Sequence, residues 1–153
     1  MLQQAKFRYL PIVFIILSAI FMQGCAISPR DYLNAGIQLY DQKQWDKADA
    51  QFTKAIENKN DFAEAYFYRG MCRLNMGDIA KAKVDFSKVV ELEPYHSEAL
   101  VKLAEVFMLD KNYGSALELL QRAAKIKNTA AISNLMGVAS YRQGKFDEAF
   151  KYY

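Results

Sequence analysis

Hydrophobic residues recur at helical spacing along most of the chain that follows residue 28. The clearest stretch is 63–96, where two apolar stripes with a period near 3.6 are separated by a polar break at 75–78. Within the break, Gly77 suits the end of the first helix and Asp78 the N-cap of the second. Pro94 ends the second stripe, because proline cannot continue the helical hydrogen-bond ladder. The pattern predicts a helical hairpin that cannot bury all of its apolar surface alone.

The same hairpin returns at a fixed period. The small residues at equivalent places lie 34, 34 and 33 positions apart: Gly36, Gly70, Ala104 and Gly137. Each is followed by a large residue after nine positions, by alanine after twelve and by another large residue after sixteen. A small residue lets two helices approach closely, and the large residue fills the space beside the crossing.

This period and these residues resemble the tetratricopeptide repeat. The resemblance implies an all-α, right-handed superhelix of antiparallel helix pairs over residues 31–153, about 3.5 repeats long. The expected repeats are 29–62, 63–96, 97–129 and an incomplete 130–153. The expected helices are 31–41 and 45–57 in repeat one, and 97–110 and 113–126 in repeat three, with helices that start near 129 and at 146 in repeat four. Ser28 with Pro29 is the expected start signal, and Ser97 the expected N-cap of repeat three.

The first 24 residues have the order of charges and apolar residues of an export signal. Lys6 and Arg8 precede an apolar run of thirteen residues, 10–22, and Cys25 follows it. The run is shorter than the roughly 20 residues that a membrane-spanning helix needs.

Residues 21–25 resemble the lipobox of bacterial lipoproteins. The resemblance implies that 1–24 is removed, that Cys25 becomes an acylated N-terminus, and that 25–30 is a short tether to the membrane. Ala26 stands where an aspartate would favour retention in the inner membrane, so in a Gram-negative organism the expected location is the periplasmic side of the outer membrane. The alternative is an uncleaved signal anchor.

Charge and residue inventory argue against several classes of function. The formal charge is +3, or +1 without residues 1–24, and no basic stripe is present, so nucleic acid is not an expected partner. His96 is the single histidine, and with Cys25 acylated only Cys72 remains, which gives no metal-ligand cluster. His96 is interpreted as a solvated residue at a helix start and Cys72 as a small buried hydrophobe. The chain is therefore expected to be non-catalytic, without cofactor or metal.

What remains is a surface for binding. In the tetratricopeptide family the first helix of each repeat lines a concave groove, and chaperone-binding members clamp a terminal carboxylate there with lysine and asparagine. Ile37 and Met71 stand where that clamp has asparagine, so a carboxylate-terminated ligand is not expected. The resemblance assigns these positions to the groove: Leu33, Ile37, Tyr40, Asp41, Phe67, Met71, Leu74, Asn75, Val101, Glu105, Met108, Leu109, Asn134, Val138, Tyr141 and Arg142. The alternative for each apolar member is packing between repeats.

The expected function is a membrane-tethered adaptor that binds a partner peptide or amphipathic helix. The resemblance suggests assembly of an envelope machine, such as a pilus or secretion pore, with recruitment of cell-wall enzymes as an alternative. Two further alternatives remain: the tethering part of a longer protein with a C-terminal enzyme, and a scaffold that self-associates through the aromatic C-terminal end.

Overall fold

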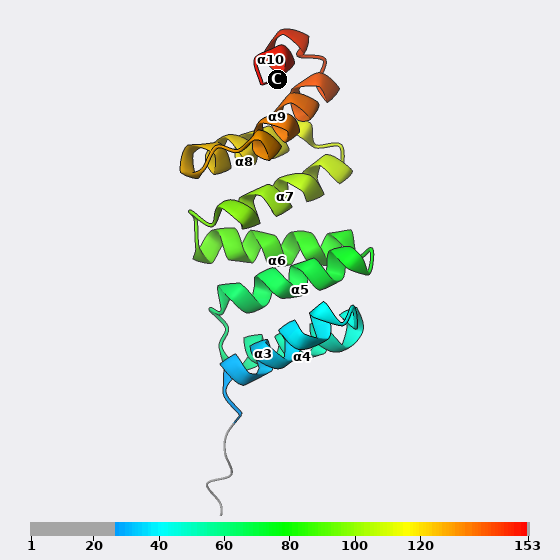
Figure 1. Ribbon diagram of the computed structural model, residues 1–153, viewed down its shortest axis with the longest axis vertical. Coiled ribbons are helices and arrows are strands. Elements are labelled where there is room, and N and C mark those ends of the chain that lie inside the picture. Colours follow the sequence, from blue (N-terminus) through cyan, green and yellow to red (C-terminus); the bar gives the residue numbers. More distant parts are fainter. Residues whose placement is uncertain (1–26, 153) are drawn as a thin grey trace, which may run out of the picture.

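The computed structural model of the protein describes residues 27–152, and these form a series of α-helices (Figure 1). The export signal and Cys25 lie outside the described residues. The helices are α3 (Pro29–Asp41), α4 (Trp45–Asn58), α5 (Ala63–Asn75), α6 (Ile79–Leu92), α7 (Ser97–Leu109), α8 (Tyr113–Ile126), α9 (Ala130–Arg142) and α10 (Phe146–Phe150). Within 27–152, none of the helices combines the length and the apolar character that crossing a bilayer requires.

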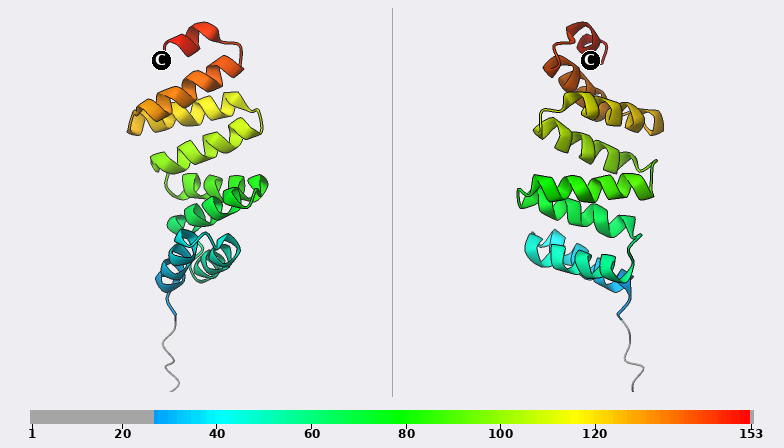
Figure 2. Two further views of the ribbon diagram at one scale, coloured as in Figure 1. Left: turned by 45° about the vertical axis from the view of Figure 1, so that its right-hand side comes forward. Right: turned by 180° about the vertical axis from the view of Figure 1, so that it is seen from behind.

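The helices stack in sequence order into an elongated array (Figures 1 and 2). Each helix packs mainly against the helix before it and the helix after it. Repeats one to four are therefore the pairs α3–α4, α5–α6, α7–α8 and α9–α10. The expected all-α solenoid of helix pairs is confirmed.

The first helix begins at Pro29, two residues before the expected start. Ser28 is the N-cap: its Oγ accepts a hydrogen bond from the Asp31 amide at 3.2 Å, and its own amide donates to the Asp31 carboxylate at 2.9 Å. This reciprocal capping box, with proline in the first turn, starts the helix immediately after the cap. The hydrogen bonds from Ser28 lower the pKa of Asp31.

Helix ends elsewhere follow the sequence prediction with one exception. Gly77 has a φ of 80°, and Asp78 caps α6 by accepting a hydrogen bond from the Lys81 amide. The prediction that Ser97 caps α7 is wrong. The cap is His96, whose backbone is extended and whose Nδ1 accepts from the Ala99 amide at 3.1 Å, while Ser97 is already the first helical residue.

The small residues at the helix crossings have the predicted role. A Cβ atom added to Gly36 would lie 2.5 Å from the Phe52 ring, and one added to Gly70 would lie 2.9 Å from the Phe86 ring. Both rings are fully buried. The close approach of each helix pair therefore depends on the missing side chain.

The buried apolar residues form two clusters rather than one. The smaller cluster joins repeat one to one side of α5: Leu33, Ala48, Phe52, Ala55, Ile56, Ala65 and Cys72. The larger cluster runs from the other side of α5 into α9. Burial raises the pKa of the Cys72 thiol to about 12, so Cys72 is a neutral packing residue, as the sequence predicted.

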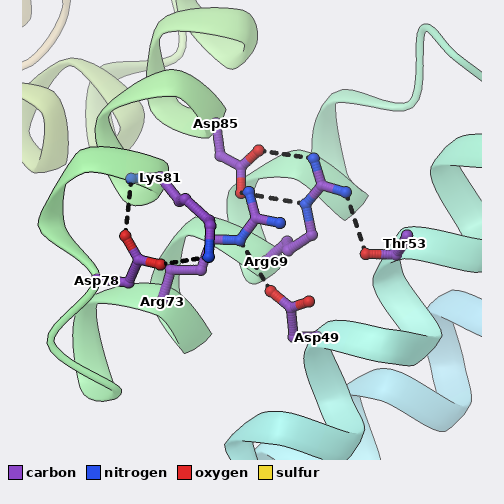
Figure 3. Close-up of polar contacts among 7 residues, drawn as sticks. All are labelled: Asp49, Thr53, Arg69, Arg73, Asp78, Lys81 and Asp85. Atoms are coloured by element: carbon purple, nitrogen blue, oxygen red, sulfur yellow. Dashed lines mark hydrogen bonds and ion pairs between the residues drawn. The ribbon is translucent and has the colours of Figure 1, made fainter.

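A network of charged side chains connects repeats one and two (Figure 3). Asp85 of α6 is fully buried and accepts hydrogen bonds from Arg69 at 2.8 and 3.1 Å and from Arg73 at 2.7 Å. Arg73 also pairs with Asp49 at 2.9 Å, and Arg69 donates to Thr53 at 3.1 Å, both on α4. Burial raises the pKa of Asp85, and Arg69 acts in the opposite sense.

The next junction in the array is built differently. The residues 34 positions after Asp49, Arg69, Arg73 and Asp85 are Lys83, Leu103, Phe107 and Leu119. Leu103 and Leu119 belong to the larger apolar cluster, and the Lys83 ammonium lies 4.3 Å from the centre of the Phe107 ring. The second junction thus has no equivalent of the charged network at these positions, whereas the repeat framework is shared.

Candidate protein-binding groove

The residues that were assigned to a groove fall into three classes of exposure. Two are buried, Leu33 and Phe67. Seven are half-buried: Ile37, Tyr40, Met71, Leu74, Val101, Glu105 and Met108. Seven are exposed: Asp41, Asn75, Leu109, Asn134, Val138, Tyr141 and Arg142. Most of the assigned positions therefore reach the surface of α3, α5, α7 and α9.

The assignment of Leu33 to a binding surface is wrong, because its side chain is fully buried in the smaller cluster. Phe67 is 8 % exposed and belongs to the larger cluster. Its ring packs on Phe86, with centroids 5.8 Å apart, and on His96 at 5.2 Å. Phe67 is consequently a packing residue beneath the surface, and little of its own side chain is available to a partner.

The half-buried apolar residues serve two purposes. Met71, Leu74 and Met108 pack on the larger cluster with part of each side chain and leave the rest exposed. Tyr40 is fixed by aromatic contacts with Trp45, at 4.9 Å, and Tyr68, at 6.0 Å. Packing between repeats and exposure for binding are therefore not exclusive alternatives at these positions.

The polar residues among the assigned positions have local partners. The Asn75 amide donates to the Met71 carbonyl at 2.8 Å, and Glu105 pairs with Lys102 at 2.9 Å. These contacts keep both side chains close to their own helix. The surface thus combines apolar patches with polar groups that are already held in place.

Sequence reasoning missed a pocket at the N-terminal ends of α5 and α7. It has a volume of about 340 Å³ and is lined by Glu64, Phe67, Tyr68, Glu93, His96 and Glu98. A signal was present, since Glu64 and Glu98 occupy equivalent places in repeats two and three. His96, interpreted from sequence as a solvated residue, is half-buried and stacks on Phe67 with an interplanar angle of 25°.

The C-terminal end of the array carries an apolar pocket of about 440 Å³, lined by Tyr141, Phe146, Ala149 and Phe150. Tyr141, Phe146 and Phe150 are 59 %, 53 % and 78 % exposed. Over residues 27–152, histidine, cysteine and carboxylate side chains form no group of three or more that could hold a metal ion.

Similar proteins share the helical repeat. The human protein SGT1 homolog is 32 % identical over 103 residues, which are 67 % of this chain and 28 % of that protein. The type IV pilus assembly protein PilF of Pseudomonas aeruginosa is 28 % identical over 99 residues, 64 % of this chain and 39 % of PilF. The chain spans about a quarter of the length of the SGT1 relatives, at 24 % of the bovine and 28 % of the human protein.

Solved structures have the same fold at low sequence identity. The crystal structure of MamA superimposes with a TM-score of 0.80 at 21 % identity, over 88 % of this chain and 79 % of MamA. YrrB, described as a TPR protein with an unusual peptide-binding site, has a TM-score of 0.78 at 22 % identity, over 88 % of this chain and 70 % of YrrB.

Two family models cover most of the described helices. The model described as anaphase-promoting complex, cyclosome, subunit 3 matches residues 75–153, and the model described as tetratricopeptide repeat matches residues 33–82. With the 34-residue period, the packed helix pairs and the solenoid fold, these matches establish that the chain belongs to the tetratricopeptide repeat family.

Proposed function

We propose that this protein is a membrane-tethered adaptor that binds a segment of another protein along α3, α5, α7 and α9. The observation that carries the proposal is the row of half-buried apolar residues on successive first helices, above all Met71, Leu74 and Met108. Tetratricopeptide folds are typical of non-catalytic scaffolds, and the description of YrrB as having a peptide-binding site supports this use of the fold.

The chemistry of the row favours an apolar peptide or the apolar face of an amphipathic helix. Methionine side chains are flexible and polarizable, so they adapt to ligands of different shape. Apolar anchors at helical or alternating spacing are the usual way in which such segments fill a groove. Leu109, which is 62 % exposed, extends this surface on α7.

The tether is proposed from the sequence at the N-terminus. If Cys25 carries lipid, residues 26–28 alone separate it from α3, a reach of about 10 Å. Repeat one would then lie at the bilayer, and the tether would raise the local concentration of the binding surface there. The name of PilF, a type IV pilus assembly protein, supports a role in assembly of an envelope machine. The proposed location, the periplasmic side of the outer membrane, rests on the lipobox resemblance and Ala26 alone.

Photo-crosslinking in intact cells tests the proposal, with a photoreactive residue in place of Met71. We expect a discrete adduct with a partner protein in wild-type cells. Leu109→Glu should abolish the adduct, because it introduces charge on the exposed binding surface. The matched control is Val84→Glu, on the second helix α6, where the side chain is 66 % exposed, and it should leave the adduct intact.

The same experiment in a Cys25→Ser background tests the tether. We expect the protein to leave the membrane fraction or to retain its signal, and the yield of adduct to fall. Unchanged membrane attachment and mature mass would contradict lipidation. Absence of any adduct in a folded, membrane-bound protein would contradict binding through this surface.

Self-association is a second candidate, and the exposure of Tyr141, Phe146 and Phe150 around an apolar pocket favours it. In this case light scattering should detect dimers whose fraction rises with protein concentration. Phe150→Glu should keep the protein monomeric, whereas Val84→Glu should not change the equilibrium. A wild-type protein that remains monomeric at high concentration would exclude this candidate.

A further inference from the structure

We propose that the pocket lined by Glu64, Phe67, Tyr68, Glu93, His96 and Glu98, here called the acidic pocket, receives a lysine or arginine side chain of the bound segment. The inference rests on the proposed binding function and specifies the chemistry of the partner. The partner segment would combine apolar side chains, for the row on α5 and α7, with a basic side chain for the acidic pocket.

The acidic pocket adjoins the apolar row. Phe67 lines the pocket, and Met71 lies one helical turn further along α5, so the two residues are neighbours on one face of the helix. A volume of about 340 Å³ lies at the small end of ligand sites and is large enough for one long side chain. A single extended segment can therefore place an apolar residue on Met71 and the next long side chain in the pocket.

The aromatic groups give the pocket a fixed wall. The rings of Phe67 and His96 are stacked with centroids 5.2 Å apart, and the hydrogen bond from the Ala99 amide to His96 Nδ1 holds the imidazole in place. Tyr68 is half-buried beside them. Aromatic rings attract cations and pack against the apolar stem of lysine or the plane of a guanidinium group.

The carboxylates make the electrostatic potential of the pocket negative. Glu64 pairs with Arg30, but Glu93 and Glu98 make no ion pair or side-chain hydrogen bond with any residue in 27–152. The charges of Glu64 and Glu98 act on the wall of the pocket: burial raises the pKa of Tyr68, and the charges of Glu64, Glu98 and Asp41 raise it further. A cleft lined by carboxylates of one sign concentrates their field on a bound cation.

Helix stability does not account for all three carboxylates. Glu64 and Glu98 lie in the first turns of α5 and α7, where a negative charge stabilises the helix dipole. Glu93 is instead the C-cap of α6, where the dipole disfavours a negative charge. A basic side chain between Glu93 and Glu98 would compensate that unfavourable position, whereas an anionic ligand would be repelled.

Binding of small probes tests the pocket directly. We would titrate the protein with N-acetyl-arginine amide and follow the backbone amide resonances of residues around the pocket by NMR. The neutral isostere N-acetyl-citrulline amide is the ligand control. We expect saturable shifts at Phe67, His96 and Glu98 with the arginine probe, at least about tenfold weaker binding of citrulline, and weakening by added salt.

Paired variants make the test specific. Glu93→Gln with Glu98→Gln should reduce arginine binding by about tenfold or more, because charge-assisted hydrogen bonds to both carboxylates are lost. Glu118→Gln, at an exposed carboxylate on α8, should leave binding unchanged. Circular dichroism of each variant checks that the fold is retained. Equal binding of arginine and citrulline, or no saturable shift at the pocket, would overturn the inference.

Crosslinking from position 71 separates this inference from the proposed function. A partner adduct that persists at full yield in the Glu93→Gln, Glu98→Gln variant would refute the role of the acidic pocket and leave the apolar surface as the binding site. Loss of the adduct in that variant, with retention in Glu118→Gln, would support the pocket. If wild-type cells give no adduct, the proposed function fails, and the probe titration still decides whether the pocket binds a cation.

Discussion

Ala82→Glu is expected to unfold the repeat array. Ala82 is fully buried on α6 within the larger apolar cluster, so a glutamate there would be placed beside apolar neighbours without water. Burial of an uncompensated charge is among the few changes that cost more than about 4 kcal/mol. Small domains are stable by only about 5–15 kcal/mol, so the variant should lose most or all of its folded population.

Thermal and urea unfolding followed by far-ultraviolet circular dichroism measure this effect. The matched control is Ala80→Glu, two residues earlier on the same helix, where the alanine is exposed and the change should cost less than about 0.5 kcal/mol. Both variants add the same side chain to α6, so helix propensity is held constant. Unchanged helicity and melting temperature for Ala82→Glu would mean that the register of the repeats is wrong.

Asp85→Ala is the second change with a large expected effect. It removes the fully buried carboxylate that accepts from both Arg69 and Arg73, and it leaves two guanidinium groups that are mostly buried without this partner. Breaking one side of a buried ion pair typically costs about 3–5 kcal/mol. We expect the midpoint of urea unfolding to fall accordingly, whereas loss of an exposed pair such as Lys88 with Glu91 should cost at most about 1 kcal/mol.

The next repeat junction supplies a stringent control for Asp85. A variant with Asp49→Lys, Arg69→Leu, Arg73→Phe and Asp85→Leu installs the residues that stand 34 positions later in the chain. Replacing a complete buried ion network by packed apolar residues is often neutral or stabilising. We expect this variant to recover most of the stability lost in Asp85→Ala; failure to recover it would show that the first junction cannot adopt the packing of the second.

The repeat pattern was sufficient to predict the helices and the crossings. Gly70, Ala82 and Phe86 lie within one hairpin, and their contacts depend on helix geometry and short separations along the chain. Pro29 and Gly77 act through local backbone conformation, which explains why their roles at helix ends were predicted as well. The groove positions were carried over from the family resemblance in the same register, and their role in binding stays a prediction.

Other features depend on side chains from different repeats and were missed. Asp85 is a polar residue within an otherwise apolar stripe. Its ion pairs with Arg69 and Arg73 form only when α6 packs against α5. His96 was expected to be solvated, yet the packing of the α6–α7 loop on α5 places its ring on Phe67. The acidic pocket needs Glu64, Glu93 and Glu98 from three segments of the chain.

The division between the two kinds of feature is physical. Helix propensity, capping and the 34-residue period act along the chain, so the order of residues alone specified an all-α repeat protein and the faces of its helices. Which half-exposed residues pack, which carboxylates converge and which charges are buried depend on the angle and separation at which one repeat meets the next. Those quantities arise from the packed side chains of both repeats, and the residue pattern of a single repeat does not contain them.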